Sequence, residues 1–97
     1  MEAAMRVDIT ARHLDVSDSI KQYVQDELNR LTKVFDRIVD VHVIFEDAES
    51  GNVKTVIIVN VPGKTLTVEE KSREITKAID QAVSKMVRQL KKYKDKF

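Results

Sequence analysis

Residues 54–69 read KTVIIVNVPGKTLTVE, and the pattern within them decides the fold. β-Branched side chains occupy nearly every position of residues 54–61, which is typical of a strand at the centre of a sheet. Pro62 and Gly63 then form a pair typical of a tight turn. Residues 65–69 alternate polar and apolar side chains, as a half-buried strand does. The sequence therefore predicts a β-hairpin here.

Two further strands are expected on the N-terminal side of this hairpin. Residues 39–46 place apolar side chains at every second position, and residues 5–10 do the same. This period of two is typical of strands with one buried face. Residues 46–52 are acidic and contain Ser50 and Gly51, which indicates a turn leading into the hairpin.

A helix is expected between these two strands. Ser17 is its candidate N-cap, because a serine hydroxyl accepts from the free amides of the first turn, and Asp18 suits the helix dipole. Apolar residues recur at three- and four-residue steps in one stripe, comprising Ile20, Tyr23, Val24, Leu28, Leu31 and Phe35. We expect Lys21 at the flank of this stripe, and Arg30 and Lys33 opposite it.

A long second helix is expected from Ser72, its candidate N-cap, because neither Gly nor Pro occurs between Ser72 and Phe97. Its apolar residues lie within an arc of roughly 100° on a wheel of 3.6 residues per turn. They are Ile75, Ile79, Ala82, Val83, Met86, Leu90, Tyr93 and Phe97. This stripe should hold the helix against the sheet.

The elements follow the order β-α-β-β-β-α, which defines an α+β fold. The length of 97 residues suits one domain, since domains average about 100–150 residues. The chain has no Cys, so it offers neither a disulfide nor a thiolate metal site. No apolar run approaches the roughly 20 residues of a membrane span, and the first residues lack a signal-peptide pattern. We therefore expect a cytoplasmic protein without a membrane partner.

Charge is distributed unevenly behind a formal net charge of +1. Residues 1–70 hold 8 Lys and Arg against 13 Asp and Glu, whereas residues 71–97 hold 9 against 3. Concentrated positive charge creates a local field that attracts polyanions. We expect a partner of this kind at the C-terminal segment, with nucleic acid the first choice and anionic lipid the second.

The basic residues of the second helix gather on the side away from its apolar stripe. They are Lys77, Lys85, Arg88, Lys91, Lys92 and Lys96, with Lys94 at the border between the two faces. A helix face that serves only solubility usually mixes charges of both signs, whereas only Asp95 interrupts the end of this one. Aromatic residues fall largely on the predicted buried faces, so recognition of RNA shape and backbone is favoured over base stacking.

The spacing of the candidate residues argues against a catalytic site, a metal site and a nucleotide-binding loop. His13 and His42 stand on different elements without a matching carboxylate or thiol pattern, so we expect neither catalysis nor a metal. The acids of residues 46–49 lack the ligand spacing of a calcium loop. Residues 63–65, Gly-Lys-Thr, lack the earlier glycine of a phosphate-binding loop, and a strand follows them.

Short motifs along the chain match a known family. They are Ile9-Thr10, His13-Leu14, Val16-Ser17, Tyr23-Val24, Phe35-Asp36-Arg37-Ile38, Val61-Pro62-Gly63, Ala78-Ile79-Asp80, Lys85-Met86, Arg88-Gln89-Leu90 and Lys92-Tyr93-Lys94-Asp95-Lys96. Over residues 5–97 the chain resembles the ribosome hibernation-promoting factors, also called ribosome-associated inhibitors and sigma-54 modulation proteins. The last motifs are the most specific.

The resemblance implies a four-stranded sheet with two helices packed on one face, similar to double-stranded RNA-binding domains. It also implies a single ribosome-binding domain over residues 1–97 that is not an enzyme and needs no cofactor and no small-molecule substrate. Such a protein binds rRNA of the small ribosomal subunit under stress or in stationary phase. There it occupies the messenger RNA channel and the transfer RNA sites, which blocks translation and conserves idle ribosomes.

Carried over to this chain, the family's rRNA contacts fall on nine cations: Lys85, Arg88, Lys91, Lys92, Lys94, Lys96, Lys21, Arg30 and Lys33. Two positions depart from the family pattern, because relatives often have a basic residue at Glu27 and an aromatic one at Thr76. The first helix should therefore contribute less than the second. Long relatives continue into a second domain that pairs ribosomes, and we expect either a short form or the N-terminal domain of a long form.

A protein-interaction module is the alternative. The strand at residues 54–61 has apolar side chains on both faces, so Val56 and Ile58, with Ile44, would lie on a sheet face without helices. Such a face would suit a weak homo-oligomer or the modulation of a transcription factor. Binding there should tolerate salt, whereas binding through the cations should weaken as salt rises.

Overall fold

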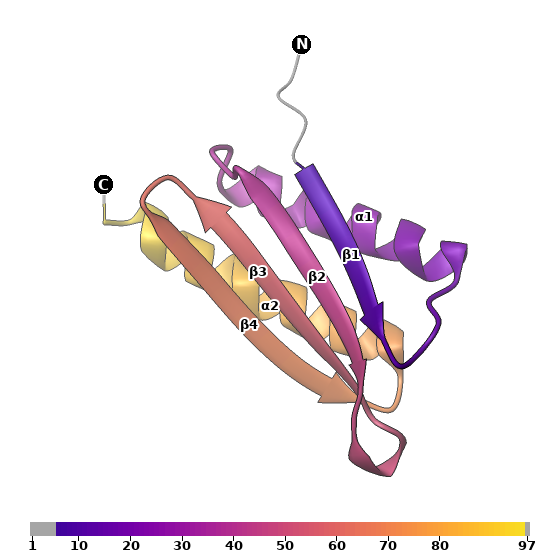
Figure 1. Ribbon diagram of the computed structural model, residues 1–97. Coiled ribbons are helices and arrows are strands. Elements are labelled where there is room, and N and C mark those ends of the chain that lie inside the picture. The colour runs from indigo at the N-terminus through magenta and orange to yellow at the C-terminus, as the bar shows by residue number, and fades with distance from the viewer. Residues whose placement is uncertain (1–5, 97) are drawn as a thin grey trace.

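The computed structural model describes residues 6–96. Its elements, shown in Figure 1, are β1 (Arg6–Arg12), α1 (Asp18–Val34), β2 (Asp40–Asp47), the short 3₁₀ turn η1 (Glu49–Gly51), β3 (Val53–Val61), β4 (Lys64–Ser72) and α2 (Ile75–Lys94). The predicted order β-α-β-β-β-α is confirmed. Met5 and Phe97, expected in the first strand and the last apolar stripe, lie outside the described residues.

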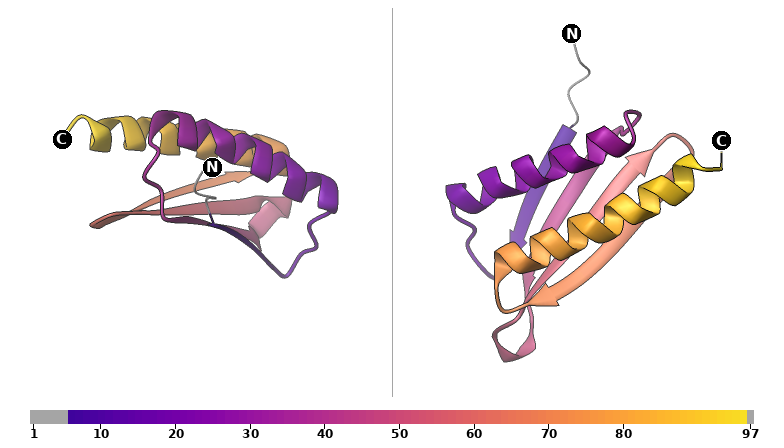
Figure 2. Two further views of the ribbon diagram at one scale, coloured as in Figure 1. Left: turned by 90° about the horizontal axis from the view of Figure 1, so that it is seen from above. Right: turned by 180° about the vertical axis from the view of Figure 1, so that it is seen from behind.

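One mixed sheet holds the four strands in the order β1-β2-β3-β4. β1 pairs with β2 in parallel through the crossover helix α1, and the remaining pairs are antiparallel. β3 is therefore an interior strand, as its β-branched composition predicts. Both helices lie on the same face of the sheet, side by side, and the other face carries no helix (Figure 2).

The predicted hairpin is formed by β3 and β4. Val61 pairs with Lys64 across the two-residue turn, and Gly63 has a φ of 82°, in the left-handed region that glycine adopts without strain. Pairing continues to Ser72 opposite Val53, so β4 extends beyond its alternating apolar residues. The hairpin forms the longest ladder of the sheet.

The prediction that Ser72 caps the second helix is wrong. Ser72 is the last residue of β4, and α2 begins three residues later at Ile75. The Ser72 hydroxyl instead accepts from the backbone N–H of Glu74 at 3.2 Å, within the connection. Strand pairing with β3 thus takes precedence over the local capping preference of serine.

The N-cap prediction for the first helix is confirmed. The Ser17 hydroxyl accepts from the backbone N–H of Ile20 at 3.2 Å, and Asp18 lies in the first turn. At the other end, Phe35 leaves the helical conformation while its N–H still donates to the carbonyl of Leu31. Each end of α1 therefore has one of its free backbone groups satisfied by a neighbouring residue of the chain.

The core lies between the sheet and the two helices. Its fully buried side chains come from every layer: Val24, Leu28 and Leu31 of α1; Val41, Val43, Phe45, Ile57 and Val59 of the sheet; Ile79, Val83, Met86 and Leu90 of α2. Ala78 and Ala82 of α2 are also buried. Ala78 extends the apolar side of α2 beyond the predicted stripe. With its opposite side committed to this core, α2 must present its cations to solvent.

Candidate RNA interface

The cations of α2 and its last turn form one exposed surface, which we call the basic face. Its members are Lys77, Lys85, Arg88, Lys91, Lys92, Lys94 and Lys96, and all seven are exposed. One shallow depression of about 320 Å³ is lined by four of these cations, Lys85, Arg88, Lys91 and Lys92, together with Gln89. The helix therefore gathers four of the nine predicted contact residues at a single concave site.

Lys85 has a partner that the sequence of its own helix does not reveal. Its ammonium forms a salt bridge with the carboxylate of Glu70 on β4. The Lys85 side chain is 51% exposed and that of Glu70 only 16%, so the carboxylate sits beneath the basic face. The adjoining depression contains charges of both signs. Its lining residues are Glu70, Asp80, Gln81, Ser84, Lys85 and Arg88. The N-terminal half of the basic face is thus less positive than the C-terminal half.

Arg30 lies between the helices, so the expectation that it stands opposite the apolar stripe of α1 is wrong. Its guanidinium donates to Glu27 at 3.0 Å on the same helix. It also donates to Asp80 at 3.3 Å and to the Ser84 hydroxyl at 3.2 Å on α2. Two carboxylates therefore offset the charge of Arg30, and its contacts join the two helices.

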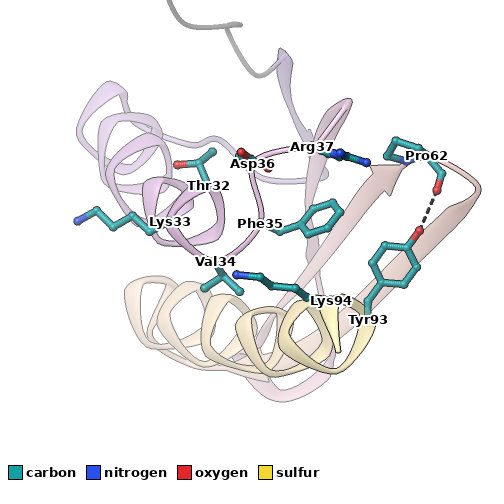
Figure 3. A pocket seen from close by; sticks show the side chains of 9 residues that line it. All are labelled: Thr32, Lys33, Val34, Phe35, Asp36, Arg37, Pro62, Tyr93 and Lys94. Atoms are coloured by element: carbon teal, nitrogen blue, oxygen red, sulfur yellow. Dashed lines mark hydrogen bonds between the residues drawn. The ribbon is translucent and has the colours of Figure 1, made fainter. Parts of the chain in front are cut away.

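Lys21 and Lys33 occupy different sides of α1. Lys21 precedes Arg30 by nine residues, which at 3.6 residues per turn is about half a rotation, so Lys21 points away from α2. Lys33 lies in the last turn of α1, where it and Lys94 line the same hollow. Of the three predicted contacts on α1, Lys33 is the one that lines a hollow together with a cation of the basic face (Figure 3).

A half-buried tyrosine lies beside the Arg30 cluster. Burial raises the pKa of the Tyr23 phenol above its ordinary value of 10.0, the carboxylates of Glu27 and Asp80 raise the pKa further, and Arg30 lowers it. The phenol is therefore neutral at physiological pH. Its environment reports directly on the packing between the two helices.

The two histidines occupy different parts of the structure. His13 lies in the connection after β1 with a φ of 63°, and His42 lies on the sheet face without helices. The ring of His42 stands between Asp8, at 3.5 Å from Nδ1, and Asp40, at 3.6 Å from Nε2. This carboxylate pair comes from neighbouring strands and was not apparent in the sequence. Within residues 6–96, no group of three or more His, Cys, Asp or Glu is arranged to hold a metal ion.

Neither helix of the described chain is long and apolar enough to cross a membrane. The fold and its exposed cations define a small α+β protein with a basic surface on its second helix. Residues 7–97 match the family model described as sigma 54 modulation protein / S30EA ribosomal protein. The chain belongs to this family, as the motif resemblance predicts.

Relatives and solved structures agree with this membership. The chain is 35% identical over 92 residues to the ribosome hibernation promoting factor of Azotobacter vinelandii, covering 95% of this chain and 85% of that protein. A ribosomal subunit interface protein from Coxiella burnetii has a similar structure, with a TM-score of 0.87 at 26% identity over 94% of this chain and 99% of that one. The N-terminal domain of Thermus thermophilus Protein Y matches with a TM-score of 0.82 at 30% identity, covering 92% and 99%. The predicted fold class is thereby confirmed.

Proposed function

We propose that this chain is a cytoplasmic hibernation factor that inhibits translation by binding the small ribosomal subunit through the basic face of α2. The exposed run of cations from Lys85 to Lys96 is the observation that carries the proposal. The names of the Azotobacter relative and of the Coxiella protein both support a ribosomal partner. On this proposal residues 1–97 act as a single ribosome-binding domain without catalysis or a cofactor.

The rRNA backbone is the expected ligand of the basic face. Each Lys or Arg that neutralises a phosphate releases condensed counterions, so affinity falls as salt rises. Five such contacts would reduce affinity about 100- to 500-fold between 50 and 200 mM salt. Binding of this kind carries little sequence information. Specificity would instead come from the fit of the whole domain to a folded rRNA site.

The proposed contact residues contribute unequally. Lys91 and Lys92 share the central depression with Lys85 and Arg88, and Lys94 and Lys96 extend the surface to the end of the helix. On α1, Lys33 lies close to this surface. Lys21 and Arg30 contribute less, because Lys21 points away from α2 and carboxylates offset the charge of Arg30.

Inhibition would follow from occlusion. A domain of this size that covers the messenger RNA channel and the transfer RNA sites excludes both ligands by mass action, with no chemical step. The test uses small subunits carrying labelled messenger RNA and labelled initiator transfer RNA, retained on a filter. We expect the protein to displace both labels in proportion to its own binding. If both labels stay bound while the protein saturates the subunits, the occlusion mechanism is wrong.

The second candidate function uses the sheet face without helices. Ile44 and Val56 are half-buried register partners on that face, and Ile58, also half-buried, lies two residues along β3 opposite His42. An apolar centre of this kind would suit a protein partner such as a transcription factor or a second copy of the chain. This function predicts salt-tolerant binding that survives reversal of the basic face.

A further inference from the structure

The core contains a hydroxyl group without a hydrogen-bond partner. Among residues 6–96, Thr55 is the one buried polar residue, and its Oγ1 makes no hydrogen bond. Thr55 alternates along β3 with the same spacing as the buried Ile57 and Val59, so its side chain faces the helices. A buried hydroxyl has given up its hydrogen bonds to water, and folded proteins seldom leave such a group unpaired. Thr55 is therefore a donor that the free chain does not use.

Thr55 stands directly opposite Glu70. The two residues are register partners in the antiparallel ladder between β3 and β4. Residues paired in this way point to the same face of the sheet, with Cβ atoms about 4.5–5.5 Å apart. The Glu70 side chain is only 16% exposed, which agrees with a position on the helix-covered face. Because a glutamate side chain turns about several bonds, its carboxylate can reach either the Thr55 hydroxyl or the surface.

In the free chain the Glu70 carboxylate is held by a cation of the basic face. It forms a salt bridge with Lys85 of α2. On the proposed function Lys85 contacts a phosphate of RNA, and a lysine that turns to a phosphate leaves Glu70 without its cation. A mostly buried carboxylate then needs another hydrogen-bond donor, since an unpaired buried charge is costly. RNA binding through Lys85 therefore requires a second partner for Glu70.

Other polar groups around Glu70 are less suited to this role. Ser84 lines the same depression, but its hydroxyl already accepts a hydrogen bond from Arg30. Arg88 also lines this depression and is itself a proposed phosphate contact. Groups exposed to solvent gain little from the carboxylate, because water competes for their hydrogen bonds. Thr55 is fully buried and unpaired, so a bond to Glu70 satisfies two groups at once.

We propose that Thr55 is a positioning residue for RNA binding by the basic face. When Lys85 turns to a phosphate, the Glu70 carboxylate turns inward and accepts a hydrogen bond from the Thr55 hydroxyl. Glu70 is thus paired with Lys85 in the free chain and with Thr55 in the bound chain. The inference rests on the proposed function, because it requires Lys85 to contact RNA. It deepens that function by naming the group that holds Glu70 after Lys85 has left.

The test is a double-mutant cycle on the intact chain, with binding measured at low salt to small subunits and, separately, to double-stranded RNA. Thr55→Val keeps the shape of the side chain and removes the hydroxyl. We expect it to lower the affinity at least about threefold, since a hydrogen bond to a charged group is lost from the bound state. In Glu70→Ala, which has no carboxylate to hold, the same substitution should change the affinity less than about 1.5-fold. An equal effect in the two backgrounds would overturn the inference.

Two further variants separate the hydroxyl from the packing of the side chain. Thr55→Ser keeps the hydroxyl and should bind within about twofold of the parent chain. Thr67→Val removes an exposed hydroxyl on the helix-free face of β4 and should also bind as the parent does. If Thr55→Ser loses as much affinity as Thr55→Val, packing sets the effect and the hydrogen bond to Glu70 is wrong.

The stability of the free chain gives an independent readout. Because the Thr55 hydroxyl has no partner there, Thr55→Val should leave the midpoint of urea denaturation unchanged or raise it. A clearly lower midpoint would mean that the hydroxyl is already bonded in the free chain, which contradicts the inference. In NMR spectra the methyl resonance of Thr55 should shift on RNA binding in the parent and not in Glu70→Ala. A methyl resonance that stays in place in the parent at saturating RNA would also contradict it.

The two ligands distinguish a failure of this inference from a failure of the proposed function. If the parent binds small subunits and Thr55→Val binds them equally well, the role of Thr55 alone is wrong. If the parent binds double-stranded RNA but not small subunits, and Thr55→Val weakens the RNA complex, the inference stands and the proposed function alone is wrong. A parent chain that binds neither ligand overturns both.

Discussion

Glu70 of β4 forms a salt bridge with Lys85 of α2, so a carboxylate from the sheet offsets the charge of one cation of the basic face. The two residues belong to different elements, and the carboxylate is the more buried partner. To bind a phosphate, Lys85 must leave Glu70 or share its charge. On the proposed function, the pair would therefore lower the affinity of the basic face for RNA near Lys85.

Replacement of Glu70 should strengthen binding. We expect Glu70→Gln to raise the affinity for small subunits about twofold to fivefold at low salt, since an ion pair with one solvent-exposed partner is worth about 1 kcal/mol. Glu69→Gln is the matched control, because Glu69 is exposed on the opposite face of β4 and its removal changes the net charge equally. Affinities measured by equilibrium cosedimentation check the prediction. Equal gains in the two variants would show that only net charge matters.

Arg30 should matter more for stability than for binding. Arg30→Gln removes contacts to Glu27, Asp80 and Ser84, and we expect the free energy of unfolding to fall by about 1 kcal/mol, since the guanidinium is partly exposed. Lys33→Gln, at an exposed position of α1, should change the free energy of unfolding by less than about 0.5 kcal/mol. Urea denaturation followed by circular dichroism measures both. A larger loss in the Lys33 variant would contradict this role of Arg30.

The N-cap of α1 supports the helix through one hydrogen bond. Ser17→Ala removes the acceptor for the N–H of Ile20 and should lower the free energy of unfolding by about 1 kcal/mol. Ser19→Ala, two residues along at an exposed helical position, should leave it nearly unchanged. Thermal unfolding of the two variants under identical conditions compares them. Equal losses would mean that the Ser17 hydroxyl does not act as the cap.

Tyr23 provides a titration signal for packing between the helices. Because its pKa is raised in the folded chain, the folded state holds the phenolic proton more tightly than the unfolded state. Its contribution to stability is therefore complete below pH 10 and is lost as the pH rises through the folded pKa. In Tyr93→Phe, Tyr23 is the one remaining tyrosine of the sequence, so absorbance at 295 nm follows it alone. A midpoint at or below pH 10.0 would contradict the raised pKa.

The elements could be predicted because each has a strong local period. The apolar stripe of α1 and the alternation of β2 specify their own buried faces, and the Pro62-Gly63 pair specifies the hairpin turn. The start of α2 could not be predicted in this way. Ser72 has the residue type of an N-cap, but its pairing with Val53 across the sheet depends on register that local sequence does not encode.

The candidate site could be predicted only as far as it lies on one element. The cations of α2 follow helical spacing, so their common face was apparent. Glu70 and Asp80 reach Lys85 and Arg30 across element boundaries, and this neutralisation appears only in three dimensions. Phe35 is buried and Tyr93 partly buried, as expected, but their contact at the ends of the two helices, beside a hollow, was not apparent. Residues that meet because two helices end at the same place have no regular spacing in the sequence, so their contact could not be predicted from it.

Cosedimentation with small ribosomal subunits tests the central claim most directly. The triple variant Lys85→Glu, Arg88→Glu and Lys92→Glu reverses the basic face, while Arg6→Glu, Arg12→Glu and Lys71→Glu make the same change in charge on strands β1 and β4. We predict that at 50 mM salt the parent chain and the strand variant pellet with the subunits and the basic-face variant does not. A folded basic-face variant that pellets as well as the parent would contradict the proposed interface.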